Sequence, residues 1–206
     1  MKFWKISLMV VTLAFLGACK ADRVIIELDG NQIKEAYAGN DVEVEFQATF
    51  EFSGDLDAKK KRMLKEVENI VRSEIQVTDF IVSGDDGDTQ VEIEGYFRLS
   101  ANNLNDPWYL YVSDFGNEFV SVSLINGNNY DSLYRAIKSV KSNFAPKAIQ
   151  PTTLRLKGKG NKFTVPVGYV DGEASVLWTG TIDGRSNIRF ADGILEETNW
   201  KILLHK

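Results

Sequence analysis

The sequence predicts an α+β fold, in which an antiparallel sheet with two amphipathic helices is followed by a β-rich C-terminal subdomain, a small barrel or curled sheet. Three observations predict it. Residues 41–52 alternate apolar and polar side chains without a break, which is typical of a half-buried strand. Two other segments carry apolar residues at helical spacing. Beyond residue 151, short apolar runs are separated by turns rich in glycine and aspartate.

The strands of the first part follow one another closely along the chain. They are expected at residues 24–28, 41–52, 75–82, 89–100, 108–112 and 118–125, and together they would form an antiparallel meander. Within 75–82 the apolar residues change sides, which predicts a bulge near Thr78 and Asp79. Gly-Asp-Asp-Gly-Asp at 84–88 predicts a tight turn.

Two segments predict amphipathic helices. Residues 57–74 would begin at Asp57 as N-cap, and residues 130–143 would have Asp131 as the cap. Their apolar faces consist of Met63, Leu64, Val67, Ile70 and Val71, and of Leu133, Ile137, Val140 and Phe144. Pro146 ends the second helix, because proline cannot continue it.

The C-terminal part is predicted to consist of short strands. They are expected at 152–157, 163–170, 174–182, 187–190 and 195–204, with turns at G-K-G-N, D-G-E, D-G-R and A-D-G. The stretch 145–151 contains two prolines and is the one linker-like segment of the chain. It separates a predicted α+β domain at 24–146 from the C-terminal subdomain at 147–206.

The first nineteen residues, MKFWKISLMVVTLAFLGAC, have the layout of a secretory signal peptide. Two lysines precede an apolar run at 6–16, which is shorter than the roughly 20 residues of a membrane-spanning helix. Small residues follow, and Leu-Gly-Ala-Cys at 16–19 matches a lipobox position by position. In these residues the chain resembles the bacterial lipoproteins.

The resemblance implies removal of residues 1–18 by cleavage between Ala18 and Cys19. Cys19 would then carry a diacylglycerol thioether and an N-acyl chain, and several acyl chains hold a protein firmly on a membrane. In this family an aspartate after the cysteine retains the protein in the inner membrane; Lys20 therefore implies the outer membrane, facing the periplasm. Residues 19–23 would be the lipidated cysteine and a tether of about 13–14 Å.

Composition and charge exclude several function classes. The chain is 44% hydrophobic and 26% charged, as folded globular proteins are. The leader holds two lysines and no acid, so the mature part has 22 basic and 29 acidic residues, a net charge of −7. Nucleic acid is therefore not an expected partner. Once Cys19 is acylated no thiol remains, which excludes disulfides, thiolate metal sites and cysteine nucleophiles.

Two basic clusters are the candidate contacts with an anionic surface or a partner. They are Lys59, Lys60, Lys61 and Arg62 in the first predicted helix, and Lys157, Lys159 and Lys162 around a glycine-rich turn. The first cluster opposes the helix dipole, which favours acids at that end. Lipid headgroups, lipopolysaccharide phosphates or an acidic protein surface would suit both clusters, and a role in solubility alone is the alternative.

Catalytic and metal motifs are not found. Asp85, Asp86 and Asp88 are a weak calcium candidate, because calcium needs several oxygen ligands; a solvated hairpin turn is the alternative. His205, the one histidine, lies on a C-terminal tail that is expected to fray. The chain has no nucleophile elbow, P-loop or HExxH motif. Neither a catalytic residue nor a cofactor is expected.

Two further groups of side chains keep other functions open. Glu43, Glu45, Glu92 and Glu94 would form an acidic patch if their strands are neighbours; such carboxylates can hydrolyse glycosidic bonds in a cleft, but a solvent-facing surface is the alternative. Trp108, Tyr111, Phe119 and Trp178 would line the cavity of a protein that binds a small hydrophobic ligand, or else belong to the core.

The sequence thus predicts a lipid-anchored envelope protein that binds a partner and is not an enzyme. Envelope assembly, secretion and surface exclusion use accessory proteins of this kind. Its expected partners are membrane lipid, through Cys19, and an envelope protein. Two other hypotheses stay open: a carrier of a small hydrophobic or lipid ligand, and a periplasmic carboxylate-dependent hydrolase.

Overall fold

The computed structural model describes residues 21, 23–85, 87–145, 152–166, 169–170, 173–174, 177–190 and 201–206. The predicted signal peptide, its cleavage site after Ala18, and Cys19 lie outside the described residues. So do Asp86 of the calcium candidate and most of the predicted strand at 195–204.

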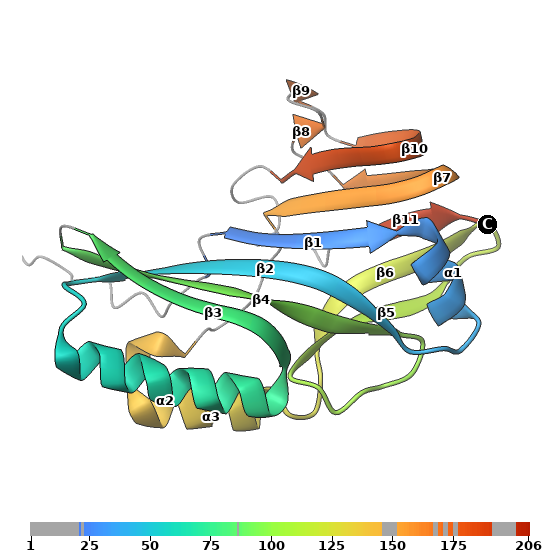
Figure 1. The fold of residues 1–206 in the computed structure, drawn as a ribbon. Coiled ribbons are helices and arrows are strands. Elements are labelled where there is room, and N and C mark those ends of the chain that lie inside the picture. Colours follow the sequence, from blue (N-terminus) through green and yellow to red (C-terminus); the bar gives the residue numbers. More distant parts are fainter. Residues whose placement is uncertain are drawn as a thin grey trace, which may run out of the picture.

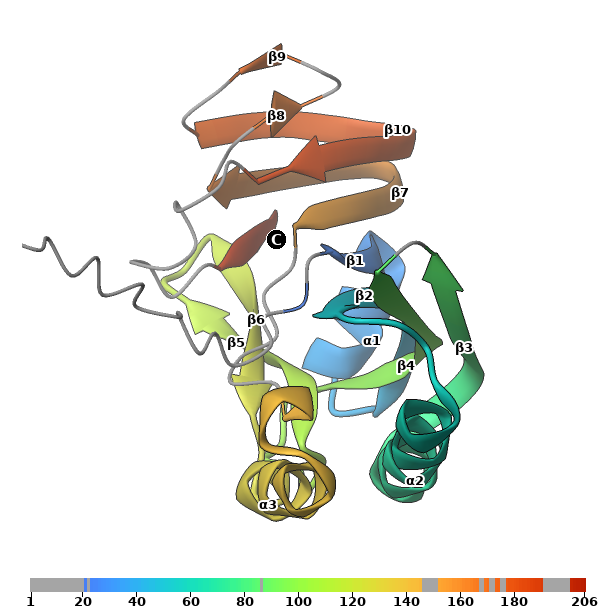
Figure 2. The ribbon, with the colours of Figure 1, turned by 90° about the vertical axis from the view of Figure 1, so that its left-hand side faces the viewer.

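Seven of the described strands close into a barrel (Figures 1 and 2). In neighbour order they are β1 (Arg23–Asp29), β2 (Val42–Ser53), β4 (Asp88–Ser100), β5 (Trp108–Phe115), β6 (Phe119–Asn126), β11 (Ile202–His205) and β7 (Thr153–Pro166). One edge of β7 closes the ring, because residues 153–157 pair in parallel with β1 while Phe163 and Thr164 pair with β11.

Four more strands extend this sheet beyond the barrel. β3 (Gln76–Asp85) pairs with β4, and β10 (Leu177–Arg189) pairs along the whole of β7. β8 (Tyr169–Val170) and β9 (Glu173–Ala174) follow at the outer edge. The register between β3 and β4 shifts between Val77 and Asp79, which confirms the predicted bulge.

The helices lie on two sides of the sheet. α2 (Ala58–Glu74), α3 (Tyr130–Val140) and the 3₁₀ helix η1 (Ser142–Phe144) lie below β2, β4 and β3, whereas α1 (Gly30–Tyr37) lies at the other end of the molecule (Figure 1). Asp57 caps α2 as predicted, since its Oδ1 accepts from Lys60 N at 2.6 Å. The cap predicted for the other helix is wrong: α3 begins after Asn129, and Asp131 lies in its first turn. α1, capped by Asp29, was not predicted.

The prediction of an α+β fold is confirmed, but two finer expectations are corrected. The barrel is not confined to the C-terminal part, because β7 and β11 complete a ring begun by β1, β2, β4, β5 and β6. The predicted antiparallel meander is interrupted, since the loop 101–107 returns the chain beside β4 and β5 then pairs with it in parallel at Leu99–Leu110. The boundary predicted at residue 147 thus separates two stretches of sequence that share one sheet.

Two predicted turns lie inside long strands. The G-K-G-N stretch falls within β7 and the D-G-R stretch within β10, where Lys159 pairs with Asp183. The register shifts between Ile182 and Asp183, and Gly160 and Gly184 have φ angles of +75° and +112°. Positive φ is strained for other residues, so the glycines allow both strands to bend together instead of reversing the chain.

Candidate functional site

An apolar layer separates the sheet from α2 and α3, and it contains a cavity of about 50 Å³. The strands contribute Phe46, Ala48, Phe50, Phe52, Phe80, Val91, Ile93 and Trp108, and the helices and their ends contribute Leu64, Val67, Val71, Ile75, Ile137 and Phe144. Every lining side chain is therefore apolar except for the indole N–H of Trp108.

Side chains from strands and from helices form the cavity, and the periodicity of each element places them. Alternation in β2 sends Phe46, Phe50 and Phe52 toward the helices, and helical spacing in α2 aims Leu64 and Val67 back at them. At one end the rings of Phe52 and Phe144 lie edge to face, with centroids 4.8 Å apart. The two helices run in opposite directions, since Asn129 Nδ2 at the start of α3 donates to Glu74 Oε2 at the end of α2.

Trp108 is the polar exception in this cavity. Its side chain is 4% exposed, its ring lies edge to face on Tyr130 at 5.6 Å, and its Nε1 has no hydrogen-bond acceptor among the described residues. A buried donor without an acceptor costs about 1–3 kcal/mol of stability. An acceptor oxygen supplied by a ligand would remove that cost.

The predicted aromatic cavity takes a different form. Of the four side chains predicted to line it, Trp108 does so, whereas Tyr111, Phe119 and Trp178 do not. Phe119 packs on His205 with centroids 4.7 Å apart, and Trp178 lies over Gly180 on β10. The cavity's other walls are aliphatic residues and phenylalanines of β2, which sequence alternation marks as buried without showing what they enclose.

Lys60 is not a surface residue, although it belongs to the first predicted basic cluster. Its side chain is 7% exposed, and Nζ donates to Ser53 O at 3.0 Å, Gly54 O at 2.6 Å and Thr89 Oγ1 at 3.0 Å. All three of its protons are used. Burial, and then the nearby Lys141, lower the pKa of Lys60. The buried cation ties the start of α2 to the ends of β2 and β4, which explains one of the lysines that oppose the helix dipole.

The other three members of that cluster are exposed. Lys59, Lys61 and Arg62 lie on the first turns of α2, and none of them makes an ion pair within the part of the chain that the structure describes. Lys138 and Lys141 of the antiparallel α3 lie toward the same end and reach over the rings of Tyr134 and Phe144. Sequence reasoning missed these two, because only tertiary packing brings α3 beside α2.

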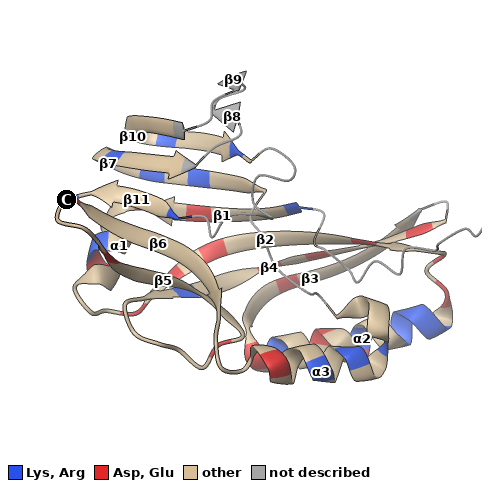
Figure 3. Cartoon of the chain, turned by 180° about the vertical axis from the view of Figure 1, so that it is seen from behind, with Lys and Arg blue, Asp and Glu red and all other residues tan. Residues whose placement is uncertain are grey.

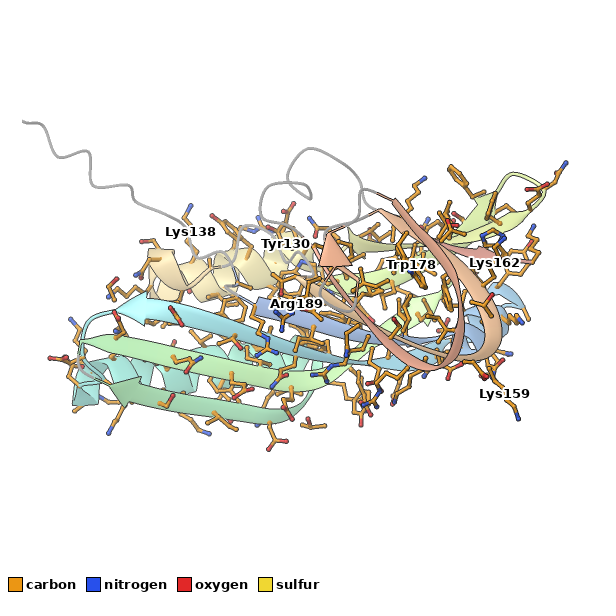
Figure 4. All side chains as sticks on the ribbon, turned by 90° about the horizontal axis from the view of Figure 1, so that it is seen from above. Tyr130, Lys138, Lys159, Lys162, Trp178 and Arg189 are labelled. Carbon is orange, nitrogen blue, oxygen red and sulfur yellow. The ribbon has the colours of Figure 1, made fainter. Side chains whose placement is uncertain are left out.

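The second predicted cluster is divided. Lys157 forms an ion pair with Glu27, so its charge is neutralised within the protein. Lys159 and Lys162 are exposed on β7 (Figure 4). Their role as contacts with a partner stays a prediction.

A polar groove lies on the opposite face of β2 and β4. It consists of two adjoining hollows of about 250 and 450 Å³ that share Glu27, Glu45 and Tyr96. Glu27 pairs with Lys157 and, at 3.3 Å, with Arg185 Nη2. Arg155 also lines the groove, and parallel pairing of β7 with β1 sets it beside Glu27. Sequence reasoning missed Glu27 and Arg155, since that pairing joins residues far apart in the chain.

The predicted acidic patch is present on that face, because β2 and β4 are neighbours. Gln47 Nε2 donates to carboxylate oxygens of both Glu92 and Glu94, which are its neighbours on β4. Glu45 and Glu94 line the groove, but Glu45 lies opposite Tyr96 instead of facing Glu94 directly. The hydrolase hypothesis requires two facing carboxylates and stays a prediction.

The remaining candidates concern metals and His205. Across the described residues, no three His, Cys, Asp or Glu side chains gather closely enough to hold a metal ion. Asp85 and Asp88 pair at the end of the β3–β4 hairpin, and Asp86 lies outside those residues. His205 does not lie on a frayed tail: it belongs to β11, and its Nε2 lies 2.9 Å from Thr164 Oγ1. Burial and Lys162 lower its pKa.

No protein-family model matches the chain, and no curated protein matches it. None of the helices in the described part of the chain combines the length and the apolar character needed to cross a bilayer.

Proposed function

We propose that this chain is a lipid-anchored envelope protein, held by acyl chains on Cys19, whose folded part binds an amphipathic ligand between the sheet and helices α2 and α3. The ligand has an apolar chain and at least one hydrogen-bond acceptor. The observation that carries the proposal is the apolar cavity beside Trp108, whose buried Nε1 has no acceptor in the part of the chain that the structure describes. The anchor rests on the lipobox at residues 16–19.

The chemistry of the cavity supports a ligand of this class. Fourteen apolar or aromatic side chains form its walls, so burial of hydrocarbon there gains about 0.8 kcal/mol for each methylene group. A carboxyl or ester oxygen would accept from the indole N–H in a site that excludes water. A purely polar ligand would lose its hydration without replacement hydrogen bonds.

The size of the cavity implies that the helices move when the ligand enters. An apolar cavity of about 150 Å³ can hold benzene, and the volume present here is about a third of that. α2 is tied to the strands by side chains, through Lys60 at its start and Arg72 Nη1, which donates to Val77 O at 2.8 Å near its end. Among the described residues no backbone-to-backbone hydrogen bond joins α2 to the sheet. Between those two ties, α2 can move outward by breaking apolar contacts alone.

Photo-crosslinking tests the proposal on the full acylated chain. The protein is placed in phosphatidylcholine nanodiscs with a palmitic acid analogue that carries a diazirine within its chain. Crosslinks are expected in peptides that contain Val67, Val71 and Ile137, which line the cavity. Crosslinks confined to the N-terminal anchor would contradict the proposal, because that segment can meet the probe within the bilayer.

A pair of tryptophan variants sharpens the test. Trp108→Phe removes the N–H and keeps an aromatic ring, so crosslinking by the fatty acid should fall several-fold while a diazirine hydrocarbon without an oxygen is unaffected. Trp178→Phe is the matched control, because Trp178 lies on β10 away from the cavity. Equal losses for both probes in Trp108→Phe would show that the ring, and not the hydrogen bond, matters.

An accessory role in envelope assembly remains a prediction beside this proposal. Crosslinking in intact cells, followed by identification of what is attached to the chain, tests it. Recovery of the unattached lipoprotein alone would count against a protein partner and leave the ligand proposal standing.

A further inference from the structure

The charges of this protein are unevenly distributed between its layers. Residues 58–74 hold six Lys and Arg against three Glu, and residues 130–141 hold three against one Asp. The two helical segments therefore carry a net charge of +5 in a chain whose total is −5, so the rest carries −10. In Figure 3 the ribbon is blue along much of α2 and in parts of α3, β7 and β10, and red in parts of β1, β2 and β3 and at one end of the helical layer.

The free cations concentrate at one end of the helical layer, where α2 starts and α3 ends. We call Lys59, Lys61, Arg62, Lys138 and Lys141 the basic end. Further along α2, Glu68 forms ion pairs with both Lys65 and Arg72, each at 2.9 Å. No such ion pair forms at the basic end within the described residues. Of the aspartates near it, Asp57 already caps α2, and Asp55 and Asp88 lie around the buried Lys60.

The proposed lipid anchor would join the chain on the same half of the molecule as the basic end. Ala21 is 3% exposed and packs in the core, and the two residues of chain between it and the proposed anchor can span at most about 7 Å. This tether is shorter than the predicted one. Arg23 pairs with Thr49 of β2, and Ser53, whose carbonyl binds Lys60, is four residues or about 13 Å further along that strand. Figure 1 shows α2 starting at the left end of the molecule and β1 starting nearer its middle, above α2.

From these two observations we infer that the basic end docks on anionic lipid headgroups of the bilayer that holds Cys19. The inference rests on the anchor of the proposed function, but not on its ligand. A tether this short holds the basic end within reach of the headgroups, and the acidic remainder of the protein is repelled from them. Such docking would set the helical layer, with the apolar cavity behind it, against the membrane surface.

Lysine labelling tests the inference on the full acylated chain. The protein is reconstituted into vesicles of phosphatidylcholine alone or of phosphatidylcholine with phosphatidylglycerol, and a water-soluble acetylating reagent is added. Mass spectrometry then gives the labelling rate of each lysine. Lys59, Lys61, Lys138 and Lys141 should react several-fold more slowly in the anionic vesicles. In about 1 M salt, where the screening length is about 3 Å, this protection should disappear.

Lys159 and Lys162 are the internal control, because they lie on β7 at the other end of the molecule from Lys138 (Figure 4). Their rates should be the same in both vesicle types. Equal rates at the basic end in both vesicles, or protection of Lys159 and Lys162 instead, would overturn the inference. Failure of the chain to float with either vesicle would overturn the anchor itself, a result that flotation separates from failure of docking alone.

Charge reversal provides the matched variants. Lys59→Glu with Lys61→Glu should return Lys138 and Lys141 to the rates seen in neutral vesicles. Lys159→Glu with Lys162→Glu makes the same change in net charge and should leave them protected. All four positions are exposed, so the fold is expected to be retained. Equal effects of the two pairs would show that only net charge matters and would overturn docking by the basic end.

Discussion

The two faces of strands β2 and β4 meet very different surroundings. The face toward α2 and α3 presents Phe46, Phe50 and Phe52 to an apolar layer with a small cavity. The opposite face presents Glu45, Gln47 and Glu94 to an open groove, across which Glu27 and Arg155 stand on β1 and β7. One alternating pattern produces both faces, because successive side chains of a strand point to opposite sides.

The two faces also differ in the charge that surrounds them, although their residues alternate along the same two strands. The apolar face is covered by the basic layer of the molecule, whereas the polar groove belongs to the acidic remainder. The apolar face is held to the helices by side-chain packing and by Lys60, the buried cation whose three protons are all bonded. The groove face is held by the ion pairs of Glu27 with Lys157 and Arg185, which solvent partly screens. Substitutions that disrupt the apolar face should therefore lower the free energy of unfolding more than substitutions in the groove.

The largest effect is expected from Lys60→Met. Methionine keeps the apolar stem, but Thr89 Oγ1 loses its donor in a buried site, and Ser53 O and Gly54 O lose theirs in partly buried ones, where Gly54 O keeps the Thr89 hydroxyl. The free energy of unfolding should fall by about 2–4 kcal/mol, measured by urea denaturation of the full chain.

Lys61→Met is the matched control for Lys60→Met. Lys61 is exposed on the next position of the helix, so its loss should change stability by less than about 0.5 kcal/mol. Equal effects of the two variants would mean that the buried cation does not hold the lower layer together.

A smaller gain is expected from Ala48→Val, which adds two methyl groups beside the cavity. At about 24 cal/mol for each Å³, a void of 50 Å³ costs about 1.2 kcal/mol, so filling it should raise the free energy of unfolding by up to about 1 kcal/mol. Crosslinking to the fatty acid probe should fall in the same variant. Thermal and urea denaturation measure the first effect.

Ala36→Val gives the contrast for Ala48→Val. Ala36 is fully buried on α1 and lines none of the three hollows described above, so the added methyl groups should destabilise by about 1–3 kcal/mol. Destabilisation of that size by Ala48→Val as well would show that the lower layer has no room to fill.

The smallest effect on stability is expected in the polar groove, from Glu27→Gln. This change removes the carboxylate that pairs with Lys157 and Arg185, both of which are partly exposed, and should cost about 1 kcal/mol or less. Its cost should shrink in high salt, because screening weakens the pairs in the parent protein. Glu35→Gln, at an exposed position, is the control. A cost above that of Lys60→Met would reverse the comparison between the faces.

Local patterns predicted much of the fold, and long-range pairing explains what they missed. Helix α2 with its Asp57 cap, the long strand β2 and the bulge after Val77 follow from neighbouring residues, and all three are confirmed. The parallel pairing of β1 with β7 was not predicted, because no local signal links Glu27 to Arg155 across so many residues. The groove they line could not be predicted for the same reason.

The basic cluster of α2 shows the same division within a single run of residues. Sequence marked Lys59, Lys60, Lys61 and Arg62 as cations that oppose a helix dipole. It could not show that Lys60 turns inward to three oxygen atoms while its neighbours stay exposed, since those oxygens come from β2 and β4.

The sequence by itself determined the expected anchor, the α+β class and the alternation that assigns each strand residue to a face, because these depend on covalent order and on side-chain periodicity. Only the tertiary structure decided which strands close the barrel, where the cavity and groove lie and which lysines remain exposed. Those features depend on contacts between distant segments, because a side chain becomes buried only when the layers around it have assembled.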